Sequence, residues 1–85
     1  MCTYLSQTTP LTGSGLRGGD DWFALDRAVI AFDHPQEAMV DHALCLDLRS
    51  ADGERLAVEL DAASARRLAE TILAVLDSDE AQAVA

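Results

Sequence analysis

Two short segments with strictly alternating apolar residues constrain this chain most. Residues 43–49 place a leucine at every second position, and residues 55–61 repeat the alternation with Leu56, Val58 and Leu60. Successive side chains of a strand point to opposite faces, so each segment is predicted to be a strand with one apolar face. Between them, Ala51-Asp52-Gly53 predicts a three-residue turn that keeps both apolar sets on one face, with Gly53 in the left-handed conformation.

A further strand is predicted immediately before this hairpin. The apolar run Ala28–Phe32 indicates a strand that extends from about Trp22 to His34. The alternation breaks near Asp26-Arg27, where a bulge is expected. Pro35 ends the strand, because proline has no N–H to donate to a ladder.

The N-terminal part predicts a short first strand and a loop. Residues 3–9 are rich in β-branched and aromatic types, which favours a strand. The stretch from Pro10 to Gly19 contains four glycines, and we expect a flexible connector there. It is not a phosphate-binding loop, because the glycine spacing differs and the chain has no lysine.

The C-terminal part predicts one amphipathic helix. Asp61 is placed to cap a helix over residues 62–77, since its side chain can accept from first-turn amides. Residues 78–85 are expected to form a flexible tail. The predicted fold is therefore α+β, with the order β-β-β-β-α: a four-stranded antiparallel sheet with one C-terminal helix on one face, in a single domain of residues 1–77. The apolar residues at helical spacing are Ala65, Leu68, Ala69, Ile72, Val75 and Leu76.

The sheet face away from this helix has nothing predicted to cover it. This face is moderately apolar, so we expect the chain to form a homodimer through sheet faces or edges. A chain of 85 residues buries only a modest core, and a partner subunit would add stability. The residues on this face are Val29, Ala31, Ala43, Cys45 and Ala57.

The register of the second and third strands brings the two histidines together. Pairing His34 with His42 sets Phe32 opposite Leu44, and it places every large apolar residue of both strands on one face. The two imidazoles would then lie side by side at one end of the sheet. Two such rings can share a metal ion or frame a pocket.

The candidate metal ligands are His34, His42 and Asp41, with zinc, iron or copper as the expected ion. Glu37 is an alternative carboxylate ligand. Asp33 or Asp41 can orient an imidazole ring by accepting a hydrogen bond from the ring N–H that does not bind the metal, as acidic residues do in metal sites.

Cys2 is the third expected ligand. Removal of Met1 would expose Cys2, whose thiol and amine can chelate a metal, and a thiolate suits zinc, copper(I) or iron. The same thiol can act as a nucleophile if a histidine lowers its pKa, so Cys2, His34 and His42 are also the candidate catalytic residues. The function expected is a small metal-binding protein, which could act as a metalloenzyme on a small molecule.

Two alternatives stand beside this interpretation. One is a metal-free enzyme or ligand-binding module that uses Cys2 and a histidine, with a small apolar molecule in a pocket between helix and sheet. The other is a non-catalytic interaction protein in which the histidines are solvated turn residues.

Charge limits the partners. The net charge is −9, with 15 acidic residues against six arginines, which argues against nucleic acid and anionic membrane surfaces. No apolar run is long enough to cross a bilayer, and the N-terminus lacks a signal-peptide pattern. A cytoplasmic location is expected, where thiols stay reduced.

Several elements together resemble one family. The pattern covers nearly the whole chain and is similar to the DUF6295 proteins, short actinobacterial proteins of unknown function. The alanine-rich, lysine-free composition fits a high-GC bacterial source. The resemblance implies family membership and no particular activity. The matching elements are the opening Met-Cys-Thr-Tyr-Leu, Trp22-Phe23 after the glycines, Phe32-Asp33-His34-Pro35, His42 with its following strand, and Val58-Glu59-Leu60 before Ser64-Ala65-Arg66.

Overall fold

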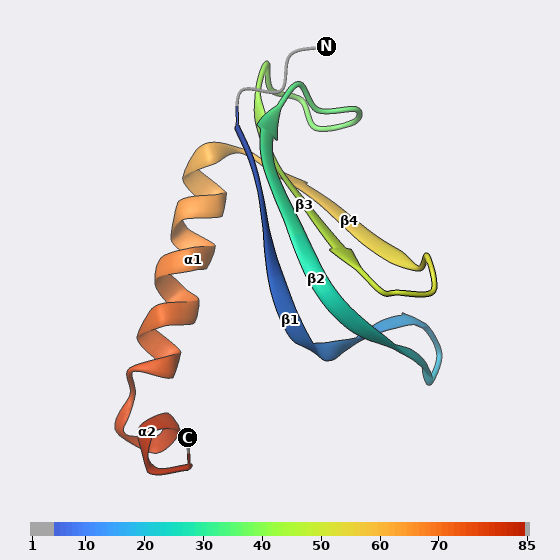
Figure 1. Cartoon of the computed structure of the whole chain (residues 1–85). Coiled ribbons are helices and arrows are strands. Elements are labelled where there is room, and N and C mark those ends of the chain that lie inside the picture. Colours follow the sequence, from blue (N-terminus) through green and yellow to red (C-terminus); the bar gives the residue numbers. More distant parts are fainter. Residues whose placement is uncertain (1–4, 85) are drawn as a thin grey trace.

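A computed structural model describes residues 5–84 as four strands followed by two helices (Figure 1). The strands form one antiparallel sheet in the order β1-β2-β3-β4, so each strand pairs with the next one in sequence. The predicted α+β fold with β-β-β-β-α order is confirmed. The elements are β1 (Leu5–Gly18), β2 (Asp21–Asp33), β3 (Ala43–Arg49), β4 (Arg55–Leu60), α1 (Ala62–Leu76) and α2 (Asp79–Val84).

The register of the central strands agrees with the prediction. Phe32 lies opposite Leu44 and Ile30 opposite Leu46, and the ladder ends at Asp33 and Ala43. Together with the β3–β4 register, this gives the sheet an apolar face and a second, more polar face. The apolar face carries Ala28, Ile30, Phe32, Leu44, Leu46, Leu48, Leu56, Val58 and Leu60. The second face carries Val29, Ala31, Cys45, Asp47, Ala57 and Glu59.

The β3–β4 turn also has the predicted form. The Ser50 N–H donates to the Glu54 carbonyl at 3.0 Å, and the Gly53 N–H donates to the Ser50 carbonyl at 3.3 Å. Gly53 has φ +92°, in the region that favours glycine. The three-residue loop Ala51-Asp52-Gly53 is therefore confirmed.

The first strand is much longer than predicted, and the expected loop from Pro10 to Gly19 is wrong. β1 pairs with β2 from Leu5 opposite Phe32 to Gly18 opposite Asp21. Between Pro10 and Gly13, β1 advances three residues while β2 advances two, so one extra residue bulges from β1. A bulge was predicted near Asp26-Arg27 of the second strand. The bulge lies beside these residues, but the extra residue belongs to β1.

Glycine explains how β1 continues through this stretch. Gly15 is buried, and a Cβ built there would lie 2.9 Å from Cδ1 of Leu56 and 3.1 Å from Cζ of Phe23. The absence of a side chain at Gly15 lets β1 run this close to Leu56 without displacing it, and Leu56 lies in β4, at the opposite edge of the sheet order.

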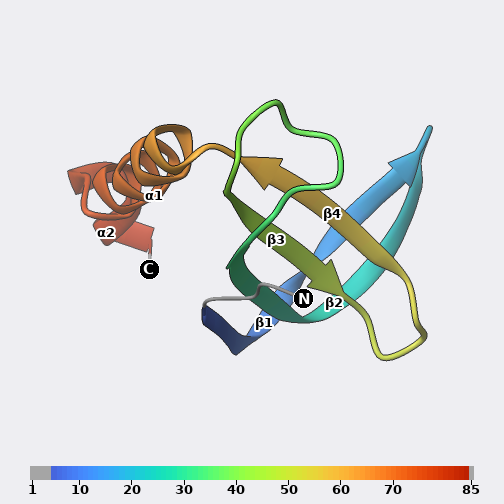
Figure 2. The same cartoon turned by 90° about the horizontal axis from the view of Figure 1, so that it is seen from above.

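Helix α1 begins as predicted. The Asp61 side chain accepts a hydrogen bond from the Ser64 N–H at 2.7 Å and caps the helix. α1 runs along one side of the sheet and approaches β3 (Figures 1 and 2). No described helix combines the length and the apolarity that a membrane span requires.

The C-terminal residues expected to form a tail contain a second helix, α2. Ser78 connects it to α1: its Oγ accepts from the Ala81 N–H at 3.2 Å, and the Gln82 side chain reaches back to the Leu76 carbonyl at 2.8 Å. The Ser78 Oγ also donates to the Val75 carbonyl at 2.7 Å, so this hydroxyl joins the end of α1 to the start of α2.

Within residues 5–84 the core is small. The buried apolar residues there are Ala28 and Ala43, and every larger apolar side chain keeps part of its surface exposed. The chain has a complete sheet and a long helix, but as a single copy it buries little between them.

Candidate functional site

The two histidines flank the loop that joins β2 to β3, and they lie together as predicted. The rings of His34 and His42 stack with their centroids 4.7 Å apart and their planes 28° apart. The His42 ring also stacks on Phe32, with centroids 5.8 Å apart. Phe32 comes from β2, so the sheet itself supports the histidine pair.

The orientation of His34 is set by its neighbours. Its Nδ1 lies 2.9 Å from the backbone carbonyl oxygen of Asp41. A carbonyl oxygen only accepts, so Nδ1 carries the hydrogen, and in the neutral ring Nε2 holds the lone pair. The Asp33 carboxylate accepts from the backbone N–H of His34 at 2.7 Å. Asp41 therefore orients the ring through its backbone, and Asp33 fixes the backbone that carries the ring.

A residue that the sequence interpretation missed, Glu59 of β4, holds this loop in place. Its carboxylate accepts hydrogen bonds from the backbone N–H groups of Gln36, Glu37 and Ala38 at 2.6, 2.9 and 3.1 Å. These hydrogen bonds, from Gln36 first, hold the pKa of Glu59 below its usual value. The contact spans more than twenty residues of sequence, and no local pattern points to it.

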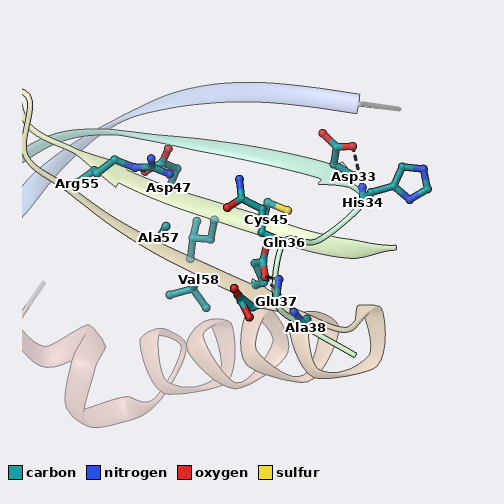
Figure 3. Close-up of a pocket in the computed structure, with 12 residues that line it drawn as sticks. Asp33, His34, Gln36, Glu37, Ala38, Cys45, Asp47, Arg55, Ala57 and Val58 are labelled. Carbon is teal, nitrogen blue, oxygen red and sulfur yellow. Dashed lines mark hydrogen bonds and ion pairs between the residues drawn. The ribbon is translucent and has the colours of Figure 1, made fainter. Parts of the chain in front are cut away.

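Between this loop and the second face of the sheet lies a hollow of about 710 Å³ (Figure 3). Cys45, Asp47 and Ala57 line it from the sheet, and Gln36 and Glu37 line it from the loop. Its place differs from the pocket expected between helix and sheet. In Figure 3 the ring of His34 stands at the end of the hollow and points away from Cys45 and Asp47, so the histidine pair adjoins the hollow without filling it.

The carboxylate of Asp47 in the hollow is paired. It accepts from Arg49 at 2.7 Å and from Arg55 at 3.1 Å. Burial raises the pKa of Asp47, but the two arginines outweigh this effect, and the pKa lies below its usual value. Asp47 is thus a carboxylate that orders two arginines at one end of the hollow.

Cys45 in this hollow is a weak nucleophile at neutral pH. Its thiol is half-buried, and burial raises its pKa, with further raising by the charges of Glu59 and Asp33. A thiol with a raised pKa is mostly protonated near neutrality, while the thiolate is the reactive form. This agrees with Cys45 having a packing role rather than a catalytic one.

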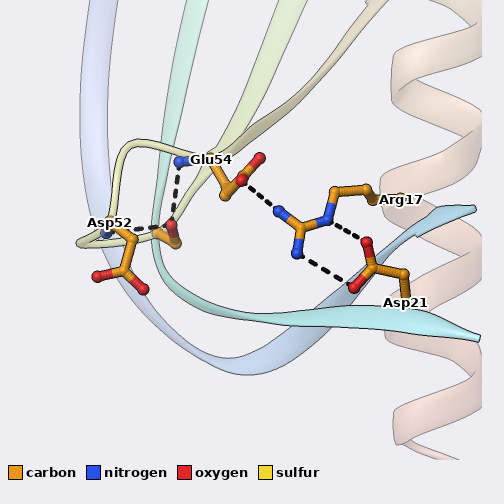
Figure 4. A network of polar contacts seen from close by, with 5 residues as sticks. Arg17, Asp21, Asp52 and Glu54 are labelled. Carbon is orange, nitrogen blue, oxygen red and sulfur yellow. Dashed lines mark hydrogen bonds and ion pairs between the residues drawn. The ribbon is translucent and has the colours of Figure 1, made fainter.

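A second polar cluster lies at the far end of the sheet (Figure 4). Arg17 of β1 forms an ion pair with Asp21 at 2.7 Å and another with Glu54 beside the β3–β4 turn. The cluster joins the tips of the two outer hairpins. All three side chains are substantially exposed, so the two ion pairs of Arg17 link the hairpin tips but add little to stability.

The predicted site residues are therefore brought together only in part. His34 and His42 are adjacent, and Asp41 approaches His34 through its backbone carbonyl rather than its carboxylate. Glu37 lies in the loop held by Glu59. Cys2 lies outside the described residues. Within residues 5–84, no group of three or more His, Cys, Asp and Glu side chains is arranged to hold a metal ion.

Comparison with known proteins identifies a family. A family model described as "Family of unknown function (DUF6295)" matches residues 1–85. Searches of curated proteins and of solved structures found no match to this chain.

Proposed function

The chain belongs to DUF6295, a family of unknown function, and we propose from its own residues that it binds a transition-metal ion at the His34–His42 pair. The observation that carries this proposal is the stacked pair itself, with centroids 4.7 Å apart at one end of the sheet. Ring nitrogens on two adjacent imidazoles can reach one ion, and neutral imidazole is a common ligand for zinc, copper and iron.

The hydrogen bond behind His34 supports the proposal. A metal-binding histidine usually donates its other ring N–H to a carboxylate or a backbone carbonyl, which fixes the tautomer. His34 makes this contact from Nδ1 to the Asp41 carbonyl. Nε2 is then the nitrogen whose lone pair a metal would use.

In this proposal, Cys2 or Asp41 supplies the third metal ligand. Leu5 pairs with Phe32, so the first described residue lies at the end of the sheet that carries the histidines. Three residue steps separate Leu5 from Cys2, a span of at most about 11 Å. A Cys2 thiolate with two imidazoles suits zinc, copper(I) or iron, and the Asp41 carboxylate is the alternative third ligand. We include in the same proposal a cytoplasmic location, which would keep Cys2 reduced.

The proposed working form is a homodimer. The half-exposed apolar side chains of a chain with so small a core support this part of the proposal. It does not depend on the metal, and each part can fail without the other.

The metal-free alternative, a small enzyme or ligand-binding module, has one observation in its favour. The hollow of about 710 Å³ has the size of a small-molecule site. In this alternative, Cys2 or a histidine would react with or contact the bound molecule. The alternative predicts that ligand binding or turnover is unchanged when metal is removed.

A zinc titration against a chromophoric competitor tests the proposal. We expect one zinc ion per chain. His34→Ala or His42→Ala should raise the zinc Kd at least tenfold, because replacing even a residue that only hydrogen-bonds to a metal ligand lowers metal affinity about 10–100-fold. Met39→Ala, in the same loop and 98% exposed, is the matched control and should leave the Kd unchanged. Equal zinc binding by all four proteins, or none by the wild type, would rule out the histidine site.

A further inference from the structure

Helix α1 exposes an apolar stripe that a folded domain normally covers. Its stripe, defined as Leu68, Ile72, Val75 and Leu76, follows the helical period along one side of the helix. These residues are 46%, 50%, 62% and 55% exposed, in that order. No residue of α1 is buried, although α1 is the long helix of the chain.

The surface area of the chain shows how much is uncovered. The chain exposes 6388 Å², whereas a folded monomer of its 9.1 kDa mass exposes about 4,900 Å² by the usual scaling. The excess is about 1,500 Å². Full exposure of the five residues outside the described range would account for about 800 Å² of it, at about 1.45 Å² per dalton, and leave about 700 Å².

This excess matches what a stable dimer needs. Standard interfaces bury about 800 Å² on each partner, and obligate homodimers bury more. An excess of about 700–1,500 Å² per copy therefore suits one dimer interface. Val58 on the apolar sheet face is 41% exposed and can add to the same interface.

The charges of α1 point to a second copy in antiparallel orientation. Arg66 and Arg67 lie near the N-terminal end of α1, whereas Asp77, Asp79 and Glu80 follow its C-terminal end. Apart from the capping Asp61, this order opposes the dipole of α1, which favours acidic residues at the start of a helix and basic residues at its end. In an antiparallel pair, each basic end would meet the acidic end of the other copy, and the two dipoles would oppose each other.

We infer that two copies of this chain associate through their α1 stripes, antiparallel and related by a two-fold axis near Ile72. Leu68 of one copy then lies opposite Leu76 of the other, and Ile72 lies opposite its own equivalent. Arg66 of each copy lies near Asp77 of the other. A two-fold interface is self-complementary in this way, because one patch serves both partners. The inference specifies the surface of the proposed homodimer and is independent of the histidine site.

Sedimentation equilibrium of the full chain in excess chelator tests the inference. We expect twice the 9.1 kDa mass for the wild type. Ile72→Asp introduces a charge at both copies of the central contact and should raise the dimer Kd about 100-fold, about tenfold for each copy. Ala74→Asp adds the same charge on the opposite, exposed side of α1 and should leave the Kd unchanged.

A charge exchange tests the orientation even if Ile72→Asp fails to fold. Arg66→Asp should weaken the dimer, because it places a second negative charge opposite Asp77, and the double variant Arg66→Asp, Asp77→Arg should restore it. A wild-type monomer, a dimer that forms only with metal, equal effects of Ile72→Asp and Ala74→Asp, or no restoration by the double variant would each overturn the inference. A wild-type protein that dimerises but binds no zinc would contradict the metal proposal and leave the dimer inference intact.

Discussion

Replacement of Gly15 by alanine tests the part of the fold that is least visible in the sequence. The new Cβ would lie 2.9 Å from Cδ1 of Leu56 and 3.1 Å from Cζ of Phe23. Ordinary carbon contacts begin at about 3.5 Å, so both Leu56 and Phe23 must move by about half an ångström. Gly13→Ala is the matched control in the same strand, because its Cβ would meet nothing within 4 Å.

The expected change in the free energy of unfolding combines two opposing effects. Alanine stabilises by about 0.4–1 kcal/mol at a compatible glycine, because it restricts the unfolded chain, and both variants gain this. Only Gly15→Ala also carries a cost of overpacking, about 1–3 kcal/mol. The atom of Leu56 that lies near the new Cβ is the end of a flexible side chain, so we expect a destabilisation of about 1 kcal/mol at this site.

Thermal unfolding followed by circular dichroism measures the difference between the two variants. For a domain of this size about 1 kcal/mol corresponds to about 4–8 °C in Tm, so Gly15→Ala should melt at least about 4 °C below Gly13→Ala. Both proteins are compared at one concentration, because dimerisation makes Tm concentration-dependent. A Gly15→Ala protein that melts at or above the Gly13→Ala protein would refute the close approach of β1 to Leu56.

Two further predictions concern titratable groups. In a Cys2→Ser background, alkylation of Cys45 should be slow at pH 7 and keep accelerating above the usual thiol pKa, because burial raises its pKa; a rate that is already maximal at pH 7 would contradict this. Glu59→Gln should lower the urea midpoint at pH 7, because the hydrogen bonds to residues 36–38 depress the pKa of Glu59 in the folded state. That stabilisation is present above the pKa of Glu59 in the unfolded chain and is lost as pH falls through its pKa in the folded protein. The difference in urea midpoint between wild type and Glu59→Gln should therefore narrow below about pH 4.5. A gap that stays constant from pH 7 to pH 3 would exclude this role for Glu59.

Local patterns predicted the centre of the molecule well. The alternation in residues 43–49 and 55–61 fixed two strands and their common face, because a shift of one residue would turn every leucine to the other side. The same rule set the β2–β3 register and brought His34 next to His42. Asp61 capped α1 as expected, since capping depends on a few adjacent residues.

Non-local contacts account for the errors. Glycines in residues 10–19 usually indicate a loop, but here Gly15 makes room for the side chain of Leu56 from β4, 41 positions later in the sequence. The Glu59 carboxylate that holds the histidine loop also comes from another strand. Periodicity predicted an apolar stripe on α1, but it could not reveal how little of that stripe the sheet covers.

Native mass spectrometry of the protein, purified without chelator or affinity tag and then given equimolar zinc, shows directly whether the His34–His42 pair binds metal. One spectrum reports the bound metal and the number of chains together. We predict a dimer with one zinc ion per chain, and a His34→Ala, His42→Ala double variant that stays dimeric without metal. A wild-type spectrum that remains metal-free, or a double variant that binds zinc as the wild type does, would contradict a metal site at the histidine pair.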